Sequence, residues 1–416
     1  MKNFNYDVAI IGACGHVGLP LSLVLANEGL KVLGLDINEE SINKIKKKIM
    51  PFLEEGSQEL LNKVIDNTFF LSLDHNKISE CENIIIIIGT PIDSDFTVDL
   101  SKLINLIKNL MPNLKENQLI ILRSTLAPKT TDYIKNFIEN NSNFKIGKNL
   151  FLATVPERLT QNNSIKELKE LSNVIGVYDD ISFEKVKNLF TKLHPGVTRV
   201  TPLEAELTKL FNNSYRAANF ALANEYFIIA ETLGANFYKI REAMNNGYSR
   251  SNVPKPGFTK GPCLGKDSWI LLNAMPHFNL STTMISAAYK INEGLPLFLV
   301  QKLKEKVNIT NKNIAILGLT FKKDSDDLRD SLSLKLVNLF KNEFVTIITH
   351  DPFVDNKNIN SVLSDADIVI LATNHTYYEN LDFKNLVKEN CLFVDLWDVL
   401  KTSLFIFNKD KLLEKK

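Results

Sequence analysis

Short, fully apolar runs alternate with amphipathic segments along the first part of the chain. The apolar runs include residues 6–12, the five consecutive isoleucines at 84–88 and the run at 119–122, and a helical pattern begins at Val17. A strand that is apolar at every position is buried on both faces, which is typical of a parallel sheet with helices on each side. The pattern predicts an α/β fold with a doubly wound lobe over residues 1–200.

A helical pattern replaces this alternation from Pro202 to Leu233. Apolar residues recur there at three- and four-residue spacing, with no Pro after the first turn, which predicts one long helix. A Gly/Pro-rich loop follows at 254–267, and four apolar runs after Asn311 predict a second doubly wound lobe. Because 416 residues exceed a single hydrophobic core, we expect three domains, at 1–200, 201–308 and 309–416.

Charge and cysteine content exclude several classes of protein. The 49 basic and 48 acidic residues nearly cancel, so no excess of positive charge indicates nucleic acid or an anionic membrane surface. The cysteines lie far apart without a CxxC pair, which argues against a zinc site or a secreted disulfide framework. No metal is predicted. No apolar run reaches the ~18 residues of a membrane span, so we expect a cytoplasmic protein.

A glycine-containing turn follows the first predicted strand. The segment at 8–36 reads as strand, glycine turn, helix, second strand and a terminal acid, Asp36. This is the order of a Rossmann-type dinucleotide-binding unit, in which the pyrophosphate lies at a helix N-terminus. Asp36 lies 21 positions after Gly15 and is placed to accept hydrogen bonds from a ribose diol and to repel a 2′-phosphate. The motif therefore favours NAD over NADP.

The glycine fingerprint is imperfect. Aligning Gly15 and Gly18 with its last two glycines leaves Ala13 at the first and Gly12 one residue early. Alanine is small enough to keep the turn, with less freedom at positive φ. The expected cofactor contacts are Gly12, Ala13, Gly15, His16, Val17, Gly18, Asp36, Thr90, Pro91, Ser124 and Thr125. A chance glycine turn is the alternative, and Thr125, expected to contact cofactor or water, could equally be a helix N-cap.

One cysteine lies in an unusual setting. Cys263 is in the loop GFTKGPCLGKD, close to Lys260 and Lys266 and four residues before Asp267. Exposure and positive surroundings favour the thiolate that nucleophilic catalysis needs. Cys81 and Cys391, in contrast, lie in apolar segments and are expected in the core.

Here the sequence resembles the UDP-glucose/GDP-mannose dehydrogenase family over nearly the whole chain. Eight motifs stand in family order, and chance does not explain such an order. They are GHVGLP (15–20), PFLEEG (51–56), GTP (89–91), RSTLAP (123–128), PERL (156–159), EAELTKLFNNSYRA (204–217), GPCLGKD (261–267) and GLTFKKDSDDLRDS (318–331). The resemblance implies an NAD-binding lobe, a helical middle that pairs subunits into a homodimer or higher assembly, and a lobe that binds a UDP-sugar.

The resemblance also implies a reaction, the four-electron oxidation of a sugar C6 alcohol to a carboxylate by two NAD molecules in sequence. Cys263 would form a thiohemiacetal and then a thioester, which water hydrolyses. Lys209 matches the lysine that stabilises the oxyanion, and Asn213 lies one helical turn further on the same face. Asp267 matches an aspartate that orients water and the lysine, and Glu157 a carboxylate that activates the hydrolytic water.

Substrate contacts are implied in three segments. They are Arg158, Leu159, Lys209, Asn213, Arg250, Phe258, Gly261, Phe321 and Lys322. Arg250 aligns with an arginine that reaches into the neighbouring subunit, although its spacing to Cys263 departs from the family pattern. The segment VDLWDVL (394–400) also departs, because many relatives have an arginine or asparagine there. PER followed by Gln161 favours a UDP-N-acetylhexosamine, such as UDP-N-acetylmannosamine, over UDP-glucose or GDP-mannose.

Each assignment has a structural alternative. Lys209 could be a solvated surface lysine, Asn213 a partner of the backbone, and Glu157 a cap or a partner of Arg158. An NAD-binding sensor or scaffold is a second function class, although it would need neither Cys263 nor Lys209. A two-electron β-hydroxyacid dehydrogenase would share the first lobe and the long helix but would lack a second β/α lobe and a nucleophilic cysteine.

Overall fold

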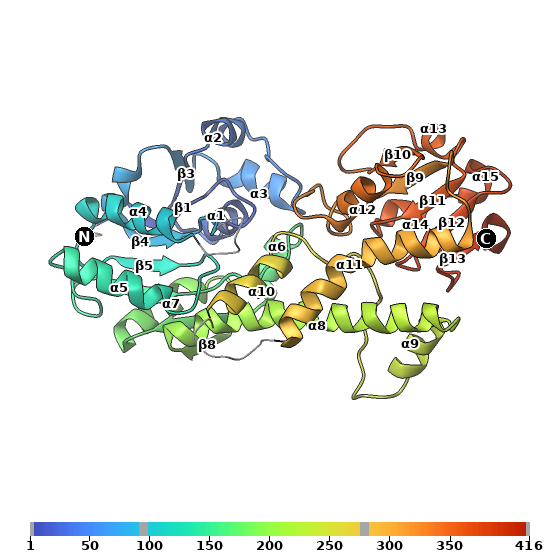
Figure 1. Cartoon of the computed structure of the whole chain (residues 1–416). Helices are drawn as coiled ribbons and strands as arrows, with labels where there is room; N and C mark the ends of the chain where they lie inside the picture. The colour runs from blue at the N-terminus through green and yellow to red at the C-terminus, as the bar shows by residue number, and fades with distance from the viewer. Residues whose placement is uncertain (1–3, 91–98, 275–282, 413–416) are drawn as a thin grey trace. The chain divides into compact units, whose positions relative to one another are not determined.

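The computed structural model describes residues 4–90, 99–274 and 283–412. The chain divides into two compact units, unit 1 (Met1–Asn212 with Trp269–His277) and unit 2 (Asn213–Ser268 with Phe278–Lys416). Each unit contains one β-sheet (Figure 1). Among the described helices, none is long and apolar enough to span a membrane.

The sheet of unit 1 has eight strands in the order β3-β2-β1-β4-β5-β6-β7-β8. The strands are β1 (Tyr6–Ile11), β2 (Val32–Leu35), β3 (Phe69–Ser72), β4 (Cys81–Ile86), β5 (Leu119–Leu122), β6 (Phe151–Thr154), β7 (Asn173–Val177) and β8 (Val197–Val200). All neighbours pair in parallel except β6 and β7. The order reverses between β1 and β4, which creates the switch point where open α/β sheets bind ligands.

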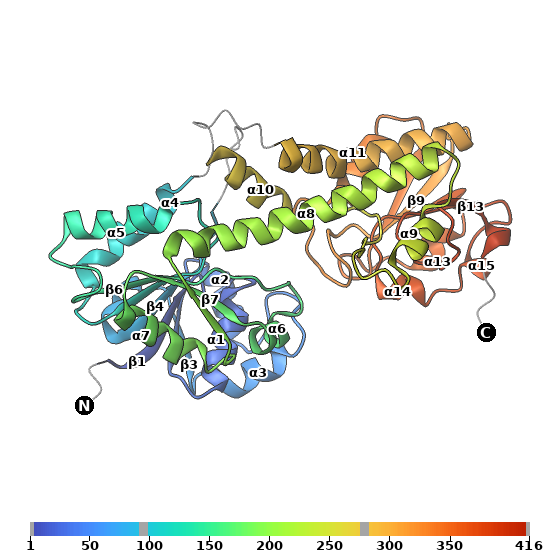
Figure 2. The same ribbon diagram turned by 90° about the horizontal axis from the view of Figure 1, so that it is seen from below.

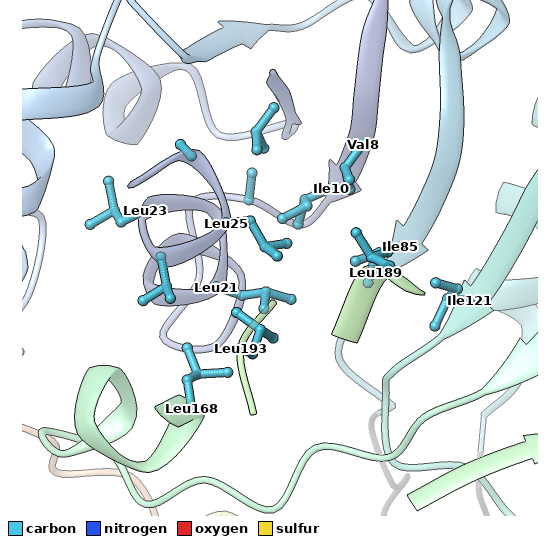
Figure 3. Packing of buried hydrophobic residues seen from close by; sticks show 14 of the residues in the cluster. Val8, Ile10, Leu21, Leu23, Leu25, Ile85, Ile121, Leu168, Leu189 and Leu193 are labelled. Carbon is cyan, nitrogen blue, oxygen red and sulfur yellow. The ribbon is translucent and has the colours of Figure 1, made fainter. Parts of the chain in front are cut away.

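Helices cover both faces of this sheet, as the apolar runs predicted (Figure 2). They are α1 (Gly18–Asn27), α2 (Glu39–Lys46), α3 (Ser57–Val64), α4 (Ser101–Leu110), α5 (Thr130–Asn141), α6 (Ser164–Glu170) and α7 (Asp180–Phe190). One face packs on α1, α2, α3, α6 and α7, and the other packs on α4 and α5. Figure 3 shows the first of these cores, where Leu21 and Leu25 of α1 lie close to Ile10 of β1.

The sheet of unit 2 has the order β10-β9-β11-β12-β13, and only β13 is antiparallel. Its strands are β9 (Asn313–Leu317), β10 (Thr346–His350), β11 (Ile368–Leu371), β12 (Leu392–Asp395) and β13 (Ile406–Asn408). One face packs on α11 (Thr283–Lys306) and α12 (Leu332–Phe340), and the other on α13 (Ile359–Leu363), α14 (Thr376–Glu379) and α15 (Phe383–Leu386). This is the second common doubly wound order, with its switch point between β9 and β11.

A 31-residue helix, α8 (Pro202–Thr232), confirms the predicted long helix. Its first turns belong to unit 1, where the buried carboxylate of Glu206 accepts hydrogen bonds from the backbone of Lys129 and Thr131 at the start of α5. Its remainder belongs to unit 2, followed by α9 (Phe237–Asn245) and the start of α10 (Leu264–Asn273), whose residues from Trp269 onward belong to unit 1. The α/β fold with two Rossmann-like lobes and a long central helix is therefore confirmed.

Candidate active site

The predicted cofactor turn begins directly after β1. Gly12 adopts φ +86°, and a Cβ built there would lie 1.9 Å from Ile87 O. A Cβ at Gly18 would lie 2.1 Å from Gly12 O, whereas one at Gly15 would be in ordinary contact at 3.6 Å. Val17, the N-cap residue of α1, has no side-chain acceptor for the first N–H groups of the helix. The turn thus depends on Gly12 and Gly18, and it presents helix N–H groups to an anion.

Asp36 lies beside this turn at the end of β2. Its Oδ2 accepts a hydrogen bond from Cys14 N at 2.8 Å, and its Oδ1 accepts one from Asn38 N at 3.0 Å. The carboxylate stays partly exposed, while Ala13 is fully buried. The corresponding acid of unit 2, Asp351 after β10, is fully buried and accepts hydrogen bonds from the backbone of its own lobe. Of these two acids, Asp36 is therefore the one that is available to a ribose.

The other predicted cofactor contacts are held by neighbouring loops. Thr90 Oγ1 donates to Thr125 O at 2.9 Å, while Ser124 Oγ accepts from Ile88 N and donates to Ile88 O. Ser124 is buried and ties together the loops after β4 and β5, whereas Thr125 is partly exposed. Pro91 lies outside the described residues.

His16 connects the glycine turn to two further loops. Its Nδ1 lies 3.0 Å from Gln161 Nε2, and its ring centroid lies 4.1 Å from that of Phe52. Cys14, in the same turn, is buried, and burial raises the pKa of its thiol to about 12. These contacts agree with packing roles for both residues.

Lys209 and Glu157 lie together in unit 1. Lys209 is only 5% exposed, and its Nζ lies 3.8 Å from Glu157 Oε2. The other carboxylate oxygen of Glu157 accepts a hydrogen bond from Leu159 N. A buried lysine next to a carboxylate differs from the solvated surface lysine that was the alternative, and such a pair can hold or move a proton.

Arg123 is a residue that the sequence did not single out, although it begins the RSTLAP motif. Arg123 is almost fully buried, and its guanidinium lies 5.2 Å from the Phe190 ring. Burial lowers the pKa of Arg123 to about 10, and the charge of Glu157 opposes this shift. The charges of Arg123 and Glu157 therefore interact. Its signal in the sequence is an arginine directly after an all-apolar strand.

Glu54 of the PFLEEG motif was missed as well. It is 5% exposed, and its carboxylate accepts hydrogen bonds from Asn162 N, Ser164 N and Ser164 Oγ. Burial raises the pKa of Glu54. These bonds fix the loop that follows Arg158 and Leu159. An acid in a loop gives no indication in the sequence of its distant partners.

Cys263, Asp267 and Asn213 belong to unit 2. Cys263 is exposed, whereas Cys81 and Cys391 are buried as predicted. Cys263 directly precedes α10, and its carbonyl accepts a hydrogen bond from Asp267 N, which places the thiol at a helix N-terminus. Such a position favours a thiolate. The fully buried Asp267 accepts a hydrogen bond from Asn213 Nδ2 at 2.5 Å, so the partner of Asn213 is a carboxylate and not the backbone.

The expected substrate contacts of unit 2 gather near its switch point. Phe321 and Lys322 follow β9, and Lys322 O accepts a hydrogen bond from Thr320 Oγ1. Gly261 adopts φ +92°, and a Cβ there would lie 2.3 Å from the Phe321 ring. Phe258 is buried in the same loop as Gly261. The cysteine loop and the loop after β9 are therefore in direct contact.

Three arginines have distinct environments. Arg158 is partly buried and donates to Ser172 O, and burial lowers its pKa. Arg250 is exposed, with its guanidinium 4.7 Å from the Tyr248 ring. Arg329 donates to both carboxylate oxygens of Asp327, two residues earlier, and this pair holds the loop after β9.

Comparison with known proteins matches three family models along the chain. They describe the NAD binding domain (residues 6–194), the central domain (203–294) and the UDP binding domain (315–402) of the UDP-glucose/GDP-mannose dehydrogenase family. The chain belongs to this family. It is therefore an NAD-dependent nucleotide-sugar dehydrogenase.

Relatives named UDP-N-acetyl-D-mannosamine dehydrogenase resemble the chain over most of its length. The protein of Methanocaldococcus jannaschii is 31% identical, over 96% of this chain and 93% of its own, and that of Pyrococcus horikoshii is 32% identical over 92% of each. A solved structure of UDP-D-ManNAc dehydrogenase from P. horikoshii matches with a TM-score of 0.87 and 28% identity, covering 94% of this chain and 96% of that one.

The nucleotide-sugar dehydrogenase has a glycine turn that fits NAD, since Gly12 and Gly18 permit the tight turn that leads into the N-terminus of α1, where no side chain caps the N–H groups. Asp36 is expected to make the enzyme select NAD, because its carboxylate would lie against the additional phosphate of NADP. Measured kcat/KM values should favour NAD strongly. Comparable values for the two cofactors would show that Asp36 has no such role.

Proposed function

We propose that this dehydrogenase oxidises the C6 alcohol of UDP-N-acetylmannosamine to the carboxylate, with Cys263 as covalent nucleophile. The observation that carries the mechanism is an exposed thiol at the N-terminus of α10, four residues before a buried carboxylate that binds Asn213. The names of relatives at about 30% identity support the substrate, and the PER motif with Gln161 favours it as well. UDP-glucose is the alternative substrate.

In the proposed reaction, NAD bound at the glycine turn supplies the hydride acceptor for each of two oxidations. Lys209 accepts the proton of the C6 hydroxyl and stabilises the oxyanion. The Cys263 thiolate then adds to the aldehyde carbon to form a thiohemiacetal, and the second oxidation leaves a thioester. Water activated by Glu157 attacks this thioester, releasing the acid and regenerating the thiol. Asn213 and Asp267 orient the reacting oxygen and the water.

The proposed reaction is tested by the number of NADH molecules formed for each UDP-sugar consumed. A panel of UDP-sugars incubated with NAD, with reduced cofactor measured by absorbance, should give two NADH for each N-acetylmannosamine derivative consumed. One NADH would indicate a simple alcohol dehydrogenase, and none would indicate a sensor or scaffold. Faster turnover of UDP-glucose than of UDP-N-acetylmannosamine would transfer the assignment to UDP-glucose.

Each of the three expected domains is proposed to have its own role. Residues 1–200 bind NAD, residues 201–308 carry the cysteine loop and the dimer contact, and residues 309–416 bind the UDP-sugar. The dimer is supported by exposed apolar side chains along one face of α8, spaced by four, seven and seven residues. These are Phe211, Tyr215, Leu222 and Ile229. A monomer at micromolar concentration in sedimentation velocity would contradict it. A cytoplasmic location is part of the proposal.

Replacing Glu157 by Gln is expected to slow hydrolysis alone, because the amide keeps the shape but cannot accept a proton. The acyl group should then accumulate on the enzyme after two hydrides have left. Mass spectrometry of the acid-quenched variant, incubated with UDP-sugar and NAD, should show one UDP-uronyl unit on the peptide that contains Cys263. If turnover is slow and no adduct forms, Glu157 acts before the thioester and its proposed role is wrong.

A further inference from the structure

The loop that leads to Cys263 has no regular secondary structure between residues 251 and 260. Buried backbone groups in such a segment need partners from side chains. Asn224 of α8, which is fully buried, provides them for Gly257. Gly257 N donates to Asn224 Oδ1 at 2.9 Å, and Asn224 Nδ2 donates to Gly257 O at 3.2 Å. The side-chain amide thus pairs with both polar groups of one residue, as a neighbouring strand would.

The Asn224 amide is itself fixed by a second buried amide. Its Nδ2 also donates to Asn292 Oδ1 at 2.9 Å, and Asn292 Nδ2 donates to Ala217 O at 3.1 Å. The Ala217 carbonyl can only accept a hydrogen bond, so the amide nitrogen of Asn292 must face it, and the Asn292 oxygen must then face Asn224. The orientation of Asn224 follows from this chain of hydrogen bonds. The side-chain amides of Asn224 and Asn292 are therefore each held in one orientation.

An aromatic ring blocks the opposite side of Gly257. A Cβ built on Gly257 would lie 2.3 Å from the indole of Trp397. Trp397 is fixed in turn, because its Nε1 donates to Ala372 O at 2.9 Å. Gly257 is therefore held between the Asn224 amide on α8 and the Trp397 ring, six residues before Cys263.

We propose that Asn224 is a positioning residue for the nucleophile: by clamping Gly257 it fixes where the loop enters α10, and so holds the Cys263 thiol at the N-terminus of that helix. The inference rests on the proposed role of Cys263. Without Asn224, the buried N–H of Gly257 loses its partner and the Gly257 carbonyl keeps only the hydrogen bond from Thr259 N, so the loop must move to satisfy the N–H. Trp397 packs against the opposite side of the same segment.

The first test is the reactivity of Cys263 in Asn224→Leu, which keeps the branched shape of the side chain and removes its three hydrogen bonds, two to Gly257 and one to Asn292. Alkylation by iodoacetamide at pH 7.5 is followed by mass spectrometry of the Cys263 peptide. The Cys263 thiol is already exposed, so moving the loop would make it little more accessible to the reagent. The move would, however, take the thiolate away from the helix N-terminus that stabilises it. We expect alkylation at least about threefold slower. The kcat should fall by about 10²-fold while the Kd for NAD stays unchanged, because a small misplacement of a reacting group has such an effect.

Gly257→Ala displaces the same segment, because its new methyl group meets the Trp397 ring. It should also slow Cys263 alkylation and lower kcat. This second variant tests the proposal if Asn224→Leu does not fold. Tyr378→Phe is the matched control, because it removes a buried hydrogen bond to His350 O elsewhere in unit 2. This control should lower the melting temperature without changing Cys263 alkylation.

The proposal is overturned if the folded Asn224 and Gly257 variants alkylate and turn over like wild type, or if Tyr378→Phe slows alkylation as much as they do. Failure of the proposed function looks different. In that case alkylation would still depend on Asn224, but Cys263→Ala would make acid at the normal rate.

Discussion

Cys263→Ala is expected to abolish formation of the uronic acid. Loss of a covalent nucleophile costs as much as about 10⁶ in kcat in hydrolases, so a loss of at least about 10⁴-fold is expected here. The second oxidation needs the thiohemiacetal, and alanine offers no thiol to form it. Product analysis by liquid chromatography and mass spectrometry would measure the acid, and calorimetry should show that NAD and the UDP-sugar still bind.

A matched control for this variant is Cys391→Ala. Cys391 is buried in the core of unit 2, and burial raises the pKa of its thiol to about 12. Its replacement should cost stability through lost packing and leave turnover intact. Acid formation at a normal rate by Cys263→Ala would end the covalent mechanism, whatever the control does.

Lys209→Ala is expected to lower turnover by several orders of magnitude with the fold intact. Removing one oxyanion-stabilising group typically costs ~10²–10³, and loss of proton transfer adds ~10²–10⁴. The buried position of Lys209, 3.8 Å from Glu157, supports both roles. Steady-state kinetics with NAD would measure the effect, and near-normal activity of the pure variant would leave Lys209 as a structural cation.

Lys209→Arg separates these two roles, because arginine keeps the charge but does not deprotonate in proteins. If Lys209 only stabilises charge, the arginine variant should recover much of the lost rate. If it also transfers the proton, the variant should stay close to alanine in kcat.

The sequence predicted β1, β2, β4, β5 and β9–β12, most of which are long apolar runs. It missed β6 and β7, although every residue of both strands is buried, because the runs are short or interrupted by Thr, Asn and Gly. β8, with the sequence VTRV, has two exposed residues at the edge of its sheet, so its pattern does not differ from that of a loop. β7 pairs antiparallel with β6, and nothing in the chain signals that reversal.

For the site, the sequence identified groups with chemistry of their own and missed those that act through tertiary contacts. Cys263 was expected in an exposed loop, which is confirmed. Ser124 was expected to contact the cofactor, whereas its hydroxyl is used by Ile88. Asn224 and Glu54 gave no signal, because their partners lie 33 to 110 positions away and only folding brings them together.

The active sites of this enzyme can be counted by titration, because one of its four thiols is exposed. Cys14, Cys81 and Cys391 are buried, and burial raises the pKa of each to about 12, so at neutral pH thiol reagents meet one accessible thiol per chain. A chromogenic disulfide reagent added to native protein should therefore release one equivalent of dye, against four after denaturation. The rapid equivalent becomes an active-site titrant, which reports the fraction of working molecules in a preparation, and oxidation of cysteine by peroxide should follow the same single-site course.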